Sequence, residues 1–336
     1  MRLAVLIAAL VAGAAPAWAQ LAGASDPGCQ AAIAYSAARR GAAVLVLRSG
    51  KPVCEGYTGI GGPAKAMETA SGTKSFSGLM LAAAVQDGLL TLDEPLARTL
   101  PEWRDDPQKA RVTLRQLLSL TSGMHSQVGR PPTYADAVAM GLSTPPGEVF
   151  AYGPAPYQLF GEIMRRKLLA AGQPGDPYLY LKRRILDPIG LVPGEWRRMP
   201  NGDALLPQGA VLTVREWVKL GELVRAGGVW NGKALVDKAT FAELFKGSRA
   251  NGAYGITFWL ARPTTATDPV TAGNDLSRAS GLPDDLVLAA GAGDQRLYIV
   301  GSQQLVVARL AAFEGLGGGA AATRWSDTEF IRFFLK

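Results

Sequence analysis

Histidine and cysteine are scarce in this chain of 336 residues, which has one histidine, His125, and two cysteines, Cys29 and Cys54. A metal centre built from nitrogen and sulfur ligands needs more such side chains than these three, so the sequence predicts no metal site. Two cysteines are also too few for a disulfide scaffold, although they can form one bridge in an oxidising compartment. The sequence leaves open whether they form that bridge or stay as two buried thiols.

Long hydrophobic runs are missing beyond the start of the chain. There, Leu3–Ala15 is an apolar run behind Arg2, and Ala17-Trp18-Ala19 has the small residues of a cleavage site, a pattern typical of a secretory signal peptide. We expect residues 1–19 to be removed and residues 20–336 to be periplasmic or secreted. No later stretch reaches the roughly 18 apolar residues that span a bilayer, so no integral membrane segment is expected after cleavage.

Charge is not concentrated in any one part of the chain. The formal net charge is +7, and the short basic runs 165–167 and 182–184 fit solvated helix faces. This distribution disfavours a nucleic-acid-binding protein. No feature of the sequence sets an oligomeric state.

Strand patterns come from both ends of the chain, and helical patterns fill its middle. The expected strands are 42–48, 53–57, 254–260, 286–290, 297–300 and 305–310, and the expected helices include 26–40, 73–86, 213–226 and 326–334. We therefore expect an α/β (α+β) fold. An antiparallel sheet flanked by helices would come from about residues 20–77 and 205–336, with a mainly helical lobe from about 78–204. A cleft between the two parts is the expected binding site.

The most informative motif is Ser71-Gly72-Thr73-Lys74, because Lys74 is the one lysine with a serine three residues before it. Residues three apart share a helix face, so the Lys74 amine can reach the Ser71 hydroxyl. A buried lysine has its charged form disfavoured, and its neutral amine can accept the serine proton. At a helix start, the Ser71 N–H and the positive helix end would stabilise an oxyanion. The alternative is that Ser71 only caps the helix and Lys74 faces solvent.

Other serine hydrolase arrangements find less support. The chain has no Gly-x-Ser-x-Gly nucleophile elbow. A Ser-His-Asp triad would have to use His125, which lies in a turn-like segment.

The segments around this motif resemble the β-lactamase-related family. Ser71–Phe76 followed by Asp87–Pro95 resembles that family's nucleophile helix, and 100–103, 112–118 and 121–124 follow in the same order and spacing. The resemblance spans most of the mature chain. It implies a β-lactamase/penicillin-binding-protein-like fold and an acyl-enzyme mechanism, as in class C β-lactamases, D-alanyl-D-alanine carboxypeptidases, serine esterases and linear-amide hydrolases.

The same resemblance identifies further site residues. Tyr152 matches the tyrosine of a Tyr-x-Asn motif, which implies that it exchanges the Ser71 proton and passes it to the leaving group. The third position of that motif is Pro154, so the asparagine is missing.

The family's third motif, Lys-Thr-Gly, has no lysine here. Its counterpart is the region around Gly291, Ala292 and Gly293, where the resemblance implies an oxyanion-binding backbone N–H near Ala292. Without the asparagine and the lysine, true β-lactamase activity is disfavoured.

The sequence as a whole predicts an exported serine hydrolase that cleaves a small ester or amide and needs no cofactor. Its partner would be a small-molecule substrate. The alternative is a non-hydrolysing, penicillin-binding-like binding or sensor protein with the same fold. Four aromatic residues are candidates for the cleft or for the core: Phe150, Trp196, Trp230 and Trp259.

Overall fold

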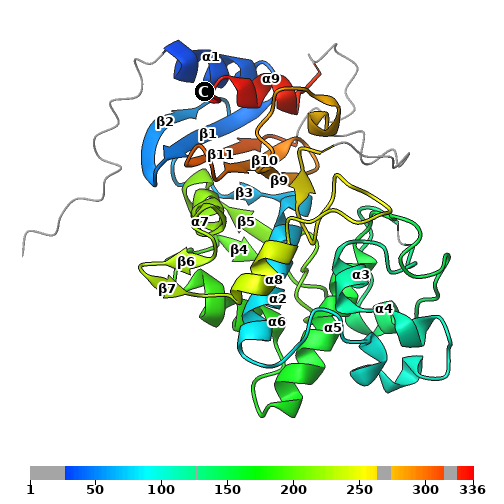
Figure 1. Ribbon diagram of the computed structural model, residues 1–336. Coiled ribbons are helices and arrows are strands. Elements are labelled where there is room, and N and C mark those ends of the chain that lie inside the picture. The colour runs from blue at the N-terminus through cyan, green and yellow to red at the C-terminus, as the bar shows by residue number, and fades with distance from the viewer. Residues whose placement is uncertain (1–26, 126, 263–273, 314–323) are drawn as a thin grey trace, which may run out of the picture.

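The computed structural model describes residues 27–125, 127–262, 274–313 and 324–336 (Figure 1). The expected signal peptide, residues 1–19, lies outside the described residues. Within the described ranges, no helix is both long enough and apolar enough to cross a membrane.

The main sheet has six antiparallel strands in the order β2-β1-β11-β10-β9-β8. Both ends of the chain build it, because β1 lies between β2 and β11. Nearly all of β1 is buried, as expected for an apolar strand covered on both faces. The strand bounds are β1 Gly41–Arg48, β2 Lys51–Tyr57, β8 Trp259–Leu260, β9 Leu286–Gly291, β10 Gln295–Val300 and β11 Leu305–Ala311.

Helices cover the two faces of this sheet (Figure 1). Helices α1 (Pro27–Ala37) and α9 (Asp327–Arg332) lie together on one face, and α7 (Val214–Arg225) packs on the other. A Cβ on Gly221 of α7 would come 2.4 Å from the Val306 side chain, so glycine allows this helix to approach β11 closely. A disulfide joins Cys29 of α1 to Cys54 of β2, and the alternative of two free thiols is therefore wrong.

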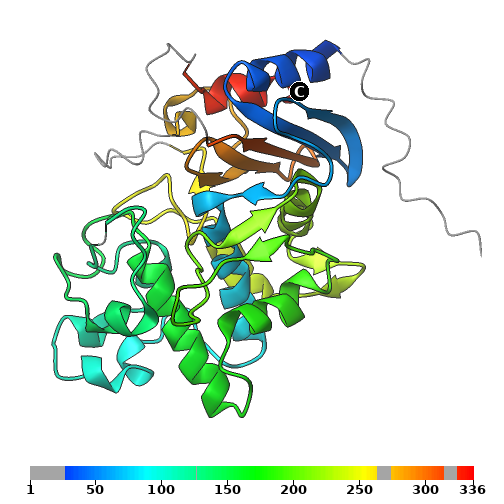
Figure 2. The same cartoon turned by 180° about the vertical axis from the view of Figure 1, so that it is seen from behind.

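A mainly helical part makes up the other end of the molecule, and α7 and a small sheet lie between it and the main sheet, as Figure 2 shows from behind. Helix α2 (Lys74–Gln86) runs from the main sheet into this part and is buried from Lys74 to Ala84. The small sheet has the order β3-β5-β4. The remaining bounds are β3 Met67–Glu68, β4 Glu195–Trp196, β5 Ala210–Leu212, β6 Val229–Trp230, β7 Lys233–Ala234, α3 Leu114–Leu118, α4 Tyr134–Ala139, α5 Ala155–Ala170, α6 Pro177–Leu181 and α8 Lys238–Glu243.

The α/β (α+β) fold with a helical part is confirmed, and the expected elements outside 254–260 agree with the structure to within three residues at each end. The expected strand over 254–260 is wrong except at Trp259–Leu260 and at Tyr254, which forms an isolated antiparallel bridge with Trp259. The Gly255 N–H donates to the Phe258 carbonyl and Thr257 has a left-handed φ of 69°, so the segment is a tight turn. A Cβ on Gly255 would lie 2.1 Å from the carbonyl oxygen of Leu244, the residue that follows α8, so this turn packs closely against the end of that helix.

Candidate active site

Ser71 lies in a short 3-10 turn, Ala70–Thr73, that leads directly into α2. Ser71 therefore lies at the helix start as expected, in a 3-10 turn and not in an α-helical one. Ala70 has a left-handed φ of 46°, an unfavourable conformation for a residue with a Cβ and one that occurs preferentially at functional sites. A Cβ on Gly72 would lie 2.7 Å from the Trp217 ring, so only glycine fits between Ser71 and Thr73.

Threonine side chains fix this turn to β5. Thr69 Oγ1 donates to the Ala210 carbonyl at 3.1 Å, and the Ala210 N–H donates to Thr73 Oγ1 at 3.1 Å. The two hydroxyls also lie 3.1 Å apart, and both side chains are buried. These bonds hold Ser71 on a rigid support.

Lys74 is buried, with 3% of its surface exposed. Its Nζ donates to Ser71 Oγ at 2.9 Å and to the Pro207 carbonyl at 3.2 Å. Burial lowers the pKa of Lys74 from 10.5 to about 7, because the charged form loses its hydration. The alternative of a solvent-facing lysine is wrong, and near neutral pH a sizeable fraction of this amine is unprotonated.

Aromatic rings surround the Lys74 amine. Its Nζ lies 5.0 Å from the Tyr152 ring centre and 5.4 Å from the Tyr157 ring centre. Tyr152 thus lies next to Lys74, and it lines the same cavity as Ser71. Pro154, two residues later, is the residue before α5 and is buried.

A buried tyrosine pair supports this arrangement and was missed from the sequence. The Tyr157 and Tyr254 hydroxyls lie 2.6 Å apart, and burial raises the pKa of both phenols well above 10. Both phenols therefore stay neutral. Tyr157 lies on the first turn of the helix that follows Tyr152, which is the sequence signal that could have identified it.

A cavity of about 200 Å³ lies beside Ser71. The predicted region Gly291, Ala292 and Gly293 lines it together with Ser71. A Cβ on Gly291 would lie 2.1 Å from the Thr69 carbonyl oxygen, so the end of β9 packs directly against the turn that carries Ser71. The other lining residues are Val128, Tyr152, Trp259, Asn274, Ala290, Asp294 and Arg296.

The candidate aromatic residues divide between cavity and core. Trp259 lines the cavity, and Phe150 packs behind it with ring centres 6.2 Å apart. Trp196 packs edge-on against Phe76 of α2 at 5.4 Å, and Trp230 packs against the hydrophobic core. Only Trp259 among these four is therefore positioned to contact a ligand.

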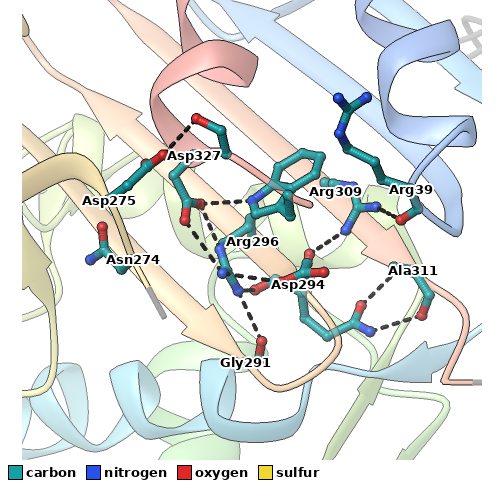
Figure 3. A network of polar contacts seen from close by, with 12 residues as sticks. Arg39, Asn274, Asp275, Gly291, Asp294, Arg296, Arg309, Ala311 and Asp327 are labelled. Atoms are coloured by element: carbon teal, nitrogen blue, oxygen red, sulfur yellow. Dashed lines mark hydrogen bonds and ion pairs between the residues drawn. The ribbon is translucent and has the colours of Figure 1, made fainter. Parts of the chain in front are cut away.

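Asn274, Asp294 and Arg296 also line the cavity and were not predicted from the sequence as site residues. Asp294 and Arg296 belong to a polar network (Figure 3). Arg296 forms a buried ion pair with Asp327 of α9, with Nε 2.6 Å from Oδ1. The same guanidinium donates through Nη1 to the Gly291 carbonyl at 2.9 Å. It thereby holds the end of β9.

The one histidine is not part of this arrangement. His125 is exposed and is not among the residues that line the cavity. In the part of the chain that the structure describes, no three His, Cys, Asp or Glu side chains are grouped as metal ligands.

Comparison with known proteins connects this geometry to a family. The sequence matches the family model described as Beta-lactamase over residues 19–325. Protein flp of Staphylococcus aureus (strain N315) is 31% identical over 150 residues, which cover 37% of this chain and 29% of flp. The chain thus spans less than a third of the length of the curated relatives it matches.

Solved structures are similar over most of the chain. A putative beta-lactamase from Bacteroides dorei DSM 17855 has a TM-score of 0.67 at 18% identity, with 85% of this chain and 89% of that chain covered. EstCE1, described as a hydrolase with promiscuous acyltransferase activity, has a TM-score of 0.65 at 16% identity, with 87% and 94% covered. At these identities the likeness concerns the fold.

Proposed function

The chain belongs to the Beta-lactamase family, and from this premise we propose that it is an exported serine hydrolase that cleaves a small ester or amide through an acyl-enzyme. One observation carries the proposal. The buried Lys74 amine lies 2.9 Å from Ser71 Oγ and has a pKa lowered to about 7, which suits a general base at neutral pH.

In the proposed acylation step, Ser71 Oγ bonds to the substrate carbonyl carbon while neutral Lys74 accepts the hydroxyl proton. The tetrahedral intermediate then collapses, and the bond to the leaving group breaks. Tyr152 relays the proton from Lys74 to the leaving-group oxygen or nitrogen, a role supported by the 5.0 Å between its ring centre and Lys74 Nζ. Water, activated by the same residues, releases the acid and restores the Ser71 hydroxyl.

The proposed oxyanion site consists of backbone N–H groups of Ser71 and of the region around Ala292. Its support is the close packing of Gly291 against the turn that carries Ser71, together with the shared cavity. Preorganised donors of this kind commonly contribute about 10²–10³ in rate each.

Esters and linear amides are favoured over β-lactams as substrates. Pro154 stands where the family motif has asparagine, and the region 289–295 has no lysine. The same two differences favour a second candidate function, a binding or sensor protein that forms an acyl adduct without turnover.

The first experiment measures intact mass after exposure to a fluorophosphonate, a short-chain aryl ester and a penicillin. We expect a phosphonate adduct and ester turnover in the native protein, because Lys74 activates Ser71. In Ser71→Ala we expect no adduct and a loss of at least about 10³ in kcat. Ser302→Ala is the control, since Ser302 is an exposed serine that bonds to Asp285, and it should keep full activity.

Each other result has a defined meaning. Unchanged hydrolysis by Ser71→Ala would falsify the proposed mechanism. A penicilloyl adduct would assign the site to penicillin recognition instead. A Ser71-dependent adduct with no turnover of any reagent would favour the sensor function.

A further inference from the structure

Arg296 is the one cationic side chain in the described lining of the cavity, but its N–H groups are already bound within the protein (Figure 3). Its Nε donates to Asp327 Oδ1 at 2.6 Å, and its Nη1 donates to the carbonyl oxygens of Gly291 at 2.9 Å and Gln295 at 3.1 Å. Its Nη2 lies 3.4 Å from Asp327 Oδ2 and 3.5 Å from Asp294 Oδ1. A guanidinium has five N–H groups, and here five acceptors face them.

A substrate carboxylate would therefore have to compete with Asp327 for Arg296. Asp327 is 1% exposed, and removing its partner would leave a buried carboxylate without charge compensation. Breaking a buried ion pair in this way is strongly unfavourable. Arg296 consequently acts as part of the cavity wall and not as an anion receptor.

The acidic group of the cavity is paired in the same way. Asp294 Oδ2 accepts a hydrogen bond from Arg40 at 2.9 Å, and its Oδ1 faces Arg296. A substrate ammonium group would have to displace two guanidinium partners. Each charged side chain in the described lining is thus neutralised by the protein itself.

The uncharged part of the lining is flat and aromatic. The Tyr152 and Trp259 rings stack with centres 5.6 Å apart and an interplanar angle of 28°. The Tyr254 ring packs edge-on against Trp259 at 4.7 Å, which fixes the indole in place. Val128 adds an aliphatic side chain to the lining. Such a surface favours a planar, apolar group by ring contact and by burial.

The volume indicates how large a group the cavity can enclose. The cavity holds about 200 Å³, and a dry cavity of about 150 Å³ in another protein accommodates benzene. A single ring with its reacting carbonyl fits beside Ser71, whereas a larger acyl group would extend out of the cavity.

We infer that the acyl group accepted by this site is uncharged and either planar or short-chain, with about the volume of a benzoyl group held inside the cavity. This inference deepens the proposed serine hydrolase function and rests on it. It assigns specificity to the paired charges of Asp294 and Arg296, which reject ionic acyl groups, and to the ring of Trp259, which holds apolar ones.

The test uses four p-nitrophenyl esters with the native protein: the benzoate, the butyrate, the 4-sulfobutyrate and the 4-(trimethylammonio)butyrate. The last three share a four-carbon acyl chain and differ in the charge at its end, and neither charged group attacks the ester carbonyl of its own molecule. We divide each kcat/KM by the alkaline hydrolysis rate of that ester, which removes intrinsic reactivity. The benzoate and butyrate should exceed both charged esters by about tenfold or more, because the charged groups lose hydration without gaining a partner.

Two variants of Trp259 test the aromatic wall. Trp259→Leu should lower the benzoate-to-butyrate ratio of kcat/KM by about three- to tenfold, the size expected for a lost ring contact. Trp259→Phe keeps a ring and should retain most of that ratio.

The outcomes separate this inference from the function on which it rests. A 4-sulfobutyryl or 4-(trimethylammonio)butyryl ester hydrolysed as fast as the butyrate, in a Ser71-dependent way, would overturn the inference alone. An unchanged benzoate-to-butyrate ratio in Trp259→Leu would also overturn it. Absence of Ser71-dependent hydrolysis for all four esters would contradict the serine hydrolase function itself.

Discussion

The lowered pKa of the Lys74 amine follows from its buried, uncharged surroundings. Its two hydrogen-bond acceptors, Ser71 Oγ and the Pro207 carbonyl oxygen, are uncharged. The ring centres of Tyr152 and Tyr157 lie 5.0 and 5.4 Å from its Nζ. Burial removes water from the ammonium form, so the neutral amine becomes accessible at physiological pH. The same side chain on the surface would be protonated and useless as a base.

The pH dependence of hydrolysis follows from this value. A base acts when it is unprotonated, so kcat/KM should rise with pH, reach half its maximum near pH 7 and level off about two units higher. Below pH 7 it should fall about tenfold per pH unit. The measurement is kcat/KM for a neutral aryl ester between pH 5 and pH 10.

Lys74→Arg is the matched variant for this profile. A guanidinium keeps the positive charge but does not deprotonate in this range, so the variant should lose both the activity and the rising limb. A native profile that is flat between pH 5 and pH 9 would argue against Lys74 as the base.

Sequence reasoning found the residues that lie near one another along the chain or within a motif. Ser71 and Lys74 are three residues apart, so helical geometry alone predicts their contact. Tyr152 and the region around Ala292 came from family resemblance. Arg296 and Tyr157 were missed because their partners, Asp327 and Tyr254, are remote in sequence, and a lone charge or ring in a strand or helix has no local signal.

The buried ion pair of Arg296 and Asp327 connects two strands and a helix. Arg296 is on β10, Asp327 is on α9, and the bonded Gly291 carbonyl ends β9. The pair therefore positions the strand end that lines the cavity while it fixes the C-terminal helix on the sheet.

Asp327→Asn should lower the free energy of unfolding by about 3–5 kcal/mol, because the buried Arg296 would lose its close ion pair and keep only the longer contact with Asp294, at 3.5 Å, as a counter-charge. Urea denaturation followed by tryptophan fluorescence measures this loss. The control is Asp187→Asn, which breaks the exposed pair with Lys182 and should cost less than about 1 kcal/mol. Similar costs for the two variants would refute the structural importance assigned to the buried pair.

The element that sequence patterns misjudged was the expected strand over 254–260. Aromatic and β-branched residues are common in this segment and favour a strand, yet the segment forms a turn against the end of α8. Within it, the Tyr254 ring packs edge-on against Trp259. Tertiary packing outweighed local preference, and the close approach of Gly255 is to a residue eleven positions away, Leu244.

The Cys29–Cys54 disulfide links the first helix, α1, to strand β2 of the main sheet. The two cysteines have a sequence separation of 25, so Cys29→Ala/Cys54→Ala should lose about 2–4 kcal/mol of unfolding free energy. Neither cysteine lines the cavity, so esterase activity below the melting temperature should persist.

Thermal denaturation with and without reductant measures this contribution. Reductant should lower the Tm of the native protein toward that of the double variant and leave the double variant unchanged. A native Tm that resists full reduction, verified by thiol counting, would contradict the prediction.

The pairing of β1 with β11 also determines when the protein can fold. Gly41 faces Ala311 in the register, so contacts at the centre of the sheet join residues from near the two ends of the chain. Such non-local pairing makes folding slow, since a large loop must close before the contacts form. A chain still emerging from the ribosome carries β1 and β2 as an unpaired hairpin, with an apolar strand edge open to aggregation. This exposure ends when β11 has been synthesised and pairs with β1, so chaperone demand should be greatest just before that point.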